Sequence, residues 1–133
     1  MSNLTIENID LGNVILSDGE FHDDLLTFSG AGTVASGTIL ARDSVSLKLV
    51  PFVKGGTTTG NGIPKAVLTY SVTATAAGDV AVRDMVSGSV RANRLIIDAD
   101  GDNSNVDAAV LDQLRAFSLV TIDIQELNIL DNQ

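Results

Sequence analysis

The strongest constraint on the fold is a period of two in residues 66–75 (AVLTYSVTAT), where apolar and polar side chains alternate. Leu68, Tyr70, Val72 and Ala74 fall on one face, and threonine and serine side chains fall on the other. This period is typical of a β-strand that packs one face on a core and exposes the other to water. We therefore expect a strand over residues 66–75.

Shorter segments repeat this alternation, and we expect each of them to form a further strand: residues 45–50, 80–86, 90–97 and 120–124. Pro51 has no amide hydrogen to donate, so the strand before it should end there or lie at a sheet edge. A turn at residues 77–79 should precede the second of these strands, and Gly88 should end it. The abundance of valine, isoleucine and threonine suits a pleated surface.

One segment has the period of a helix instead. Apolar residues recur there at spacings of three and four: Val106, Val110, Leu111, Leu114 and Phe117. Ser104 or Asn105 is placed to cap the first turn, and Arg115 suits the last turn. The sequence thus predicts a mainly β domain with one short α-helix at about residues 105–117. Polar or glycine-rich connections are expected at residues 17–24, 54–64 and 98–105.

Size and charge exclude several classes of partner. The chain has 133 residues, the usual size of one domain. Its 17 acidic and 8 basic residues give a net charge of −9, which repels nucleic-acid phosphates and anionic lipids. No apolar run approaches the roughly 18 residues of a membrane span, and no targeting signal is visible. Cysteine is absent, which excludes disulfides and thiolate metal sites.

The sharpest local motif is a set of alternating carboxylates, Asp98, Asp100 and Asp102, which matches the start of a calcium-binding loop. The match then fails, because Asn103 stands where the loop needs glycine and Ala109 where it needs glutamate. We expect a solvated acidic turn with no bound metal. A calcium-binding β-rich surface or adhesion module remains the alternative function.

No catalytic constellation is found. His22 is the only histidine and adjoins Asp23 and Asp24, but no patterned nucleophile or second metal ligand accompanies it. The glycines of residues 55–62 lack the following Lys-Ser/Thr pair of a phosphate-binding loop. We therefore expect no enzyme activity, cofactor or small-molecule substrate, and a structural or interaction role is favoured.

The N-terminal segment holds apolar islands among acidic and amide residues, and it has two interpretations. Its apolar residues are Leu4, Ile6, Ile9, Val14, Ile15 and Leu16. They form either strands of the same domain or an extended arm that completes the sheet edge of a neighbouring protein. The residue pattern alone does not choose between the two.

Several short motifs, in order, resemble the phage lambda head decoration protein family. They are residues 37–41 (GTILA), 48–52 (KLVPF), a Gly/Thr-rich loop and residues 66–68 (AVL). Residues 88–90, the helix with Leu111 and Leu114, and residues 120–122 follow the same order. The resemblance covers about residues 30–124.

This resemblance implies a compact domain of the β-clip type at residues 29–133 and a capsid-engaging N-terminal segment at residues 1–28. It implies a homotrimer on the outer surface of an expanded icosahedral phage capsid, at threefold and quasi-threefold sites. There the trimer would clamp subunits of the major capsid protein against internal DNA pressure. The virion would be its final location, after synthesis in the host bacterial cytoplasm. On this basis we assign the capsid contact to an arm with Leu4, Ile6, Ile9, Val14 and Leu16.

Overall fold

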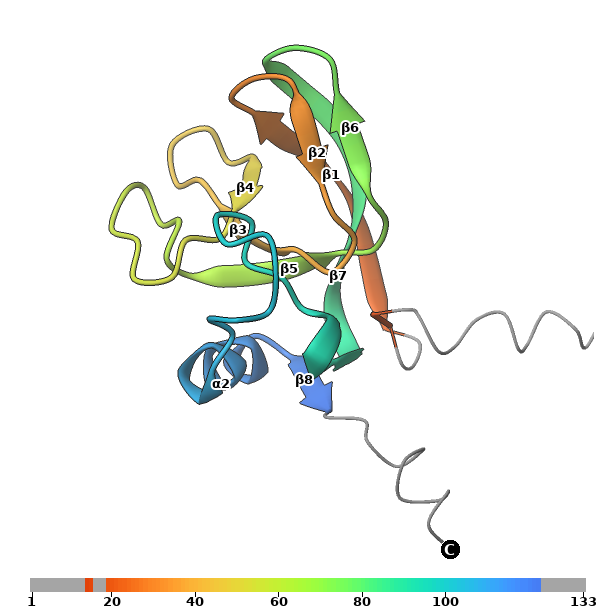
Figure 1. Ribbon diagram of the computed structural model, residues 1–133, viewed down its shortest axis with the longest axis vertical. Helices are drawn as coiled ribbons and strands as arrows, with labels where there is room; N and C mark the ends of the chain where they lie inside the picture. The colour runs from red at the N-terminus through yellow and green to blue at the C-terminus, as the bar shows by residue number, and fades with distance from the viewer. Residues whose placement is uncertain (1–13, 16–18, 123–133) are drawn as a thin grey trace, which may run out of the picture.

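The computed structural model describes residues 14–15 and 19–122, and within them it is mainly β with a single α-helix (Figure 1), as the sequence predicts. The strands are β1 (Glu20–Phe28), β2 (Gly32–Val34), β3 (Ile39–Arg42), β4 (Leu49–Pro51), β5 (Pro64–Leu68), β6 (Val72–Ala74), β7 (Gly78–Arg91) and β8 (Leu119–Ile122). The helix is α2 (Ala108–Ala116), and a 3₁₀ turn, η1 (Ala92–Arg94), follows β7. None of the helices in this part of the chain is long and apolar enough to cross a membrane.

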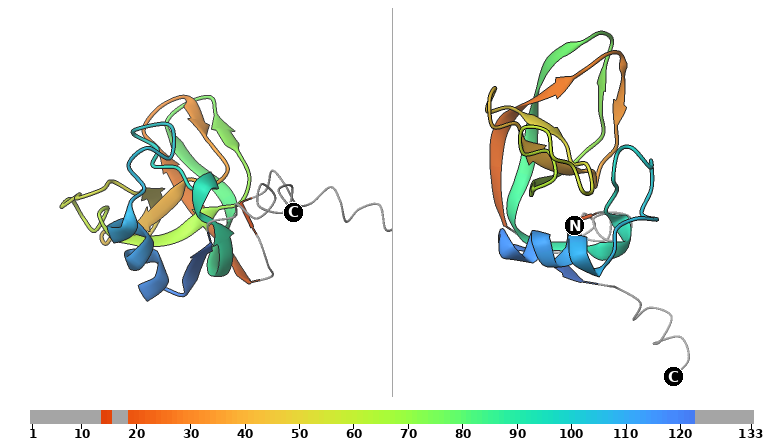
Figure 2. Two further views of the ribbon diagram at one scale, coloured as in Figure 1. Left: turned by 60° about the horizontal axis from the view of Figure 1, so that its bottom comes forward. Right: turned by 90° about the vertical axis from the view of Figure 1, so that its left-hand side faces the viewer.

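The main sheet closes on itself. Its strand order is β1-β4-β3-β5-β7-β8, and an additional antiparallel pairing joins β1 to β7. This pairing turns the sheet into a small barrel, which the right-hand view of Figure 2 shows from its side. Strand β8 extends the sheet by pairing in parallel with residues 88–91 of β7. Strands β2 and β6 form a separate two-stranded ribbon.

Two apolar clusters pack against opposite faces of the barrel wall. The interior cluster comprises Leu26, Phe28, Val34, Leu40, Leu49, Ala66, Leu68, Val72 and Val82. The second cluster lies between the wall and α2, and includes Ile39, Ala41, Val67, Met85, Val110 and Leu114. Neighbouring residues of one strand, such as Leu40 and Ile39, therefore enter different clusters. Burial on both faces explains the continuous apolar runs ILA in β3 and AVL in β5.

The prediction of one long strand at residues 66–75 is wrong, because the chain passes from the main sheet to the separate ribbon within this segment. Strand β5 ends at Leu68, and β6 begins at Val72 in the separate ribbon. Leu68 and Val72 are buried as expected, but Tyr70 lies in the crossing and is 46% exposed.

Four other predicted boundaries also change. Residues 44–46 form a turn instead of a strand, although Pro51 does end β4 as predicted. Strand β7 continues through Gly88, whose φ of 126° is accessible to glycine. The strand expected at residues 90–97 is instead the end of β7, the turn η1 and two isolated bridges. The connection expected at residues 17–24 gives way to β1 from Glu20 onward, whereas residues 54–63 form the predicted long loop.

Helix α2 lies close to its predicted bounds, but a different residue, Asp107, caps its first turn. The Asp107 carboxylate accepts the amide hydrogen of Val110 at 3.1 Å. Ser104 and Asn105, the predicted caps, instead donate to Asp102 and Asp100 in the preceding turn. Val110 and Leu114 are the buried residues of the helix, so its predicted apolar face does point into the core. In β8, Leu119 is buried and Val120 is exposed.

The start of the described chain is part of the domain. Val14 is only 2% exposed and belongs to the cluster under α2. Its carbonyl accepts the Arg91 amide hydrogen at 2.7 Å, and Ile15 forms an antiparallel bridge with Val90. Residues 20–28, assigned by the sequence to the N-terminal segment, form β1 of the barrel. Leu4, Ile6, Ile9 and Leu16 lie outside the described residues.

Replacing Val14 with alanine should lower the free energy of unfolding by roughly 1–3 kcal/mol, because it leaves a cavity at a packed position. Urea denaturation followed by circular dichroism measures this change. Val45→Ala is the matched control, since Val45 is 79% exposed and its truncation should cost less than about 0.5 kcal/mol. Equal stability of the Val14 variant and the unaltered protein would contradict the packing described here.

Candidate binding surface and the polar cluster behind it

Two carboxylates of the calcium-like motif, Asp100 and Asp102, accept hydrogen bonds from neighbouring residues of the same turn. The Asp102 carboxylate accepts hydrogen bonds from the Ser104 amide at 3.0 Å and from the Ser104 hydroxyl at 2.7 Å. Asp100 accepts from the Asn105 side chain at 2.9 Å. Across residues 14–15 and 19–122, no group of three or more His, Asp or Glu side chains is placed to hold a metal ion. The described geometry therefore gives the alternative calcium-binding function no support.

His22 and the glycine-rich loop also have simple structural roles. His22 lies on β1, is exposed, and sits 3.9 Å from the carboxylate of Glu20. In the loop, the Asn61 side chain accepts the Thr58 amide hydrogen, and Gly62 packs directly on the Gly56 backbone. A Cβ at position 62 would lie 2.1 Å from the Gly56 carbonyl oxygen, so glycine is required there by close packing.

The loop between β3 and β4, residues 43–48, is the most unusual exposed feature. It presents Val45 and Leu47, which are 79% and 65% exposed. Asp43 organises it: one carboxylate oxygen accepts the amide hydrogens of Val45 and Ser46 at 2.8 and 2.9 Å. The other oxygen accepts the Thr59 hydroxyl at 2.8 Å. These bonds, that from Ser46 first, hold the pKa of Asp43 below its usual value.

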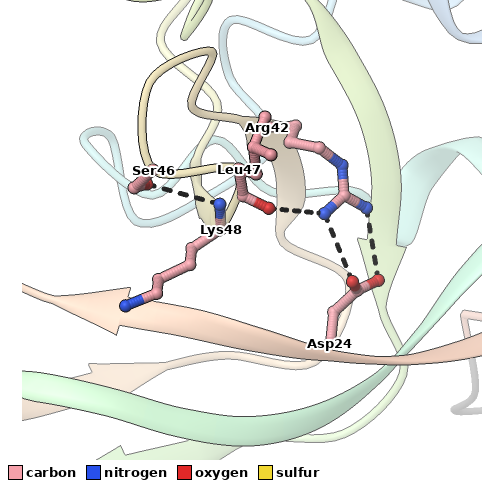
Figure 3. A network of polar contacts seen from close by, with 5 residues as sticks. All are labelled: Asp24, Arg42, Ser46, Leu47 and Lys48. Atoms are coloured by element: carbon pink, nitrogen blue, oxygen red, sulfur yellow. Dashed lines mark hydrogen bonds and ion pairs between the residues drawn. The ribbon is translucent and has the colours of Figure 1, made fainter.

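Leu47 adopts a backbone conformation that disfavours its own side chain. Its φ is 64°, in the left-handed region, where an L-residue other than glycine pays about 1–2 kcal/mol. Two hydrogen bonds hold it there. The Leu47 amide donates to the Asp43 carbonyl at 2.8 Å, and its carbonyl accepts from Arg42 Nη1 at 2.9 Å (Figure 3).

Arg42 is itself fixed from β1. Its two terminal nitrogens contact the two oxygens of Asp24 at 3.2 and 3.3 Å, a paired geometry that Figure 3 shows. Burial, the largest single influence, raises the pKa of Asp24, but the hydrogen bonds from Arg42, the neighbouring Asp84 carboxyl and the Arg42 charge together outweigh burial and leave the pKa lowered. The ion pair thus links β1 to the β3–β4 loop.

A second carboxyl lies beside this ion pair. Asp84 of β7 is fully buried, and within the described part of the chain neither of its oxygens meets a hydrogen-bond partner. Burial raises the pKa of Asp84 to about 7, the neighbouring Asp24 carboxylate acts in the same direction, and the Arg42 charge opposes both. Neutral pH is therefore close to the pH at which the Asp84 carboxyl gains or loses its proton.

In front of the cluster lies a groove of about 370 Å³, lined by Asp23, Asp24, Leu25, Leu47, Lys48 and Ala81. Leu25 is 42% exposed, so the groove is partly apolar. Lys48 is paired with Asp79 and Arg42 with Asp24. Sequence reasoning missed this surface because it placed residues 45–50 in a strand. Asp43 followed by Ser44 and Ser46 is a turn signal that would have indicated a loop.

These features define a small β-barrel-like domain with an exposed, partly apolar loop between β3 and β4. A comparison with protein families agrees with this class: the family model for Bacteriophage lambda head decoration protein D matches residues 4–119. The chain belongs to this family and is thus a structural protein of the phage capsid surface. A search of curated proteins finds no match.

The raised pKa of Asp84 predicts an unusual pH dependence of the free energy of unfolding. Between the ordinary carboxyl pKa of 3.8 and about 7, the folded protein keeps a proton that the unfolded chain gives up. Stability should therefore fall with rising pH, by roughly 2–4 kcal/mol between pH 4.5 and pH 7.5. Urea denaturation at a series of pH values measures this slope. The lowered pKa values of Asp24 and Asp43 act below this window.

Asp84→Asn should flatten the profile, because the amide stays neutral and can donate to Asp24. His22→Gln is the control: His22 pairs with Asp84 across the β1–β7 ladder, and its replacement should preserve the slope. A profile of Asp84→Asn that parallels the unaltered protein would rule out Asp84 as the source.

Proposed function

We propose that this protein binds the outer surface of an expanded icosahedral phage capsid as a homotrimer and stabilises it against internal DNA pressure. The sites are threefold and quasi-threefold positions, and the partner is the major capsid protein. The observation that carries the proposal is the family match, which begins at residue 4 and so includes most of the N-terminal segment.

The capsid contact is assigned to the segment before Val14 and to Leu16. Leu4, Ile6 and Ile9 supply its apolar side chains, and its backbone can add to a sheet edge of the capsid protein. Val14 has a different task, since its side chain is buried within its own domain. It anchors the arm. Leu16 keeps its assignment to the capsid contact as a proposal.

The attachment of Val14 to β7 determines how force on the N-terminal arm would reach the domain. Residues 1–13 would span at most about 47 Å if fully extended, and they join a residue that is fixed to β7. Three such arms on one trimer turn weak separate contacts into avidity, because the second and third engagements are intramolecular. The net charge of −9 suits a location outside the shell, away from the packaged genome.

Deleting residues 1–13 should leave a folded trimer that no longer decorates shells, because the deletion spares Val14 and all of β1. Light scattering should give about three times 13.8 kDa for the full chain and a trimer of the shortened one. Co-sedimentation with expanded shells lacking decoration protein measures binding. A variant with Leu4, Ile6 and Ile9 changed to serine is the length-matched control and should also fail to bind.

Two results would contradict the proposal. Undiminished shell binding by the shortened protein would remove the arm from the mechanism. A full chain that stays monomeric both in solution and on shells would remove the trimer.

A further inference from the structure

We propose that the Asp84 carboxyl is a proton-controlled switch for the loop of residues 43–48. With its proton, Asp84 leaves Arg42 bound to the Leu47 carbonyl. Without its proton, Asp84 attracts Arg42 toward β7 and frees that carbonyl, so that the loop changes conformation. This inference goes beyond the proposed function and does not depend on it.

The first argument is the position of Asp84 itself. Its exposed fraction is 0%, and within the described part of the chain neither carboxyl oxygen has a hydrogen-bond partner. An ionised carboxylate is costly at such a place unless donors or a cation compensate it, whereas the neutral acid is tolerated. When Asp84 loses its proton to water, the new charge is therefore stabilised by any cation that moves toward it.

Arg42 is a cation that can respond in this way. The titratable and charged groups that face Asp84 come from β1 and β3. On β1 they are His22, which stands opposite Asp84 in the ladder, and Asp24, two residues further along. On β3 the group is Arg42, which pairs with Asp24. Burial raises the pKa of Asp84 and the Arg42 charge opposes that shift, which places Arg42 within electrostatic reach.

The other elements packed on β7 bring no competing charge to this face. Strand β5 places Leu68 opposite Asp84, and its one lysine, Lys65, lies over the Phe117 ring, 4.1 Å from the ring centroid. Strands β6 and β8 contain no charged residue. Arg83 adjoins Asp84 on β7, so its exposed side chain points to the opposite face of the strand.

The second argument is that Arg42 holds the loop as well as Asp24. Its Nη1 donates to the Leu47 carbonyl at 2.9 Å and to Asp24 at 3.2 Å (Figure 3). In the closed wall, β1 with Asp24 lies between β4 and β7. A guanidinium that turns from Asp24 toward β7 therefore turns away from the loop that precedes β4. Leu47 then loses one of the two hydrogen bonds that hold its φ at 64°, and its backbone can leave the left-handed region.

The switch operates around neutral pH. Because the pKa of Asp84 is raised to about 7, chiefly by burial, this carboxyl holds its proton about one pH unit below that value and has lost it about one unit above. The pKa values of Asp24 and Asp43 are lowered, so both carboxylates keep their charge throughout this range. Asp24 lines the groove, which gives water access to the cluster.

An NMR titration of the full chain from about pH 5 to about pH 9 tests the switch. It follows the side-chain carboxyl carbon of Asp84 and the backbone chemical shifts of Leu47. The Leu47 shifts should move from left-handed toward extended values as the pH rises, with the same midpoint as Asp84. Asp84→Asn is neutral at every pH and should keep Leu47 at its low-pH shifts throughout.

Two variants are matched controls. His22→Gln removes the histidine that faces Asp84, since imidazole also exchanges a proton near neutral pH. Asp79→Asn removes another carboxyl of β7, the one that pairs with Lys48 of the loop. Both variants should show the Leu47 transition of the unaltered protein.

A Leu47 transition that shares the midpoint of Asp84 and is absent from Asp84→Asn supports the inference. Leu47 shifts that stay at left-handed values over the whole titration of the unaltered protein overturn it, whether or not Asp84→Asn folds. A transition that persists in Asp84→Asn, or that is lost in His22→Gln, assigns control to another group and also overturns it. Shell binding is measured separately, so failure of the switch leaves the proposed function intact.

Discussion

The pairing of β1 with β7 is the interaction on which the rest of this structure depends. It runs from Phe28 opposite Gly78 to Glu20 opposite Ser87, with one irregularity near its end. Because it joins the first strand of the sheet to a later one, it closes the barrel and satisfies backbone groups that would otherwise form open edges. The closed wall then creates an interior, and α2 can cover part of the outer face without competing for the same side chains. The pairing also brings Asp24 and Asp84, distant in the sequence, into one cluster.

Local sequence patterns predicted those parts of the fold that depend on local physics. The helix was found because Val110 and Leu114 repeat at its period, and the end of β4 because Pro51 lacks a donor. The split between β5 and β6 was missed because alternation continues through Tyr70, while tertiary closure decides where the chain leaves the barrel. The same limit applies to Gly88, since a positive φ allows a strand to bend and continue.

The candidate binding surface was harder to predict from the sequence than the fold. Val45 and Leu47 alternate with polar residues as a strand would, and this alternation hid the turn signal of Asp43, whose hydrogen bonds form the turn. The left-handed backbone of Leu47 leaves no trace in the sequence, because the residue usually preferred there is glycine. The state of Asp84 depends on neighbours from β1 and β3 that only barrel closure supplies. Family resemblance, by contrast, was readable from short motifs whose order survives such local differences.

The placement of Val90 has a mechanical consequence. This residue of β7 is bridged by Ile15 on one side and paired with Thr121 of β8 on the other. The chain thus enters and leaves the described domain at points about two strand spacings apart, or roughly 10 Å. Tension applied before Val14 reaches β7 directly, through the Arg91–Val14 hydrogen bond, and spreads along the β1–β7 ladder. This path includes neither the 54–63 loop nor helix α2, so their sequences can vary without altering how load passes from Val14 to β7 and β1.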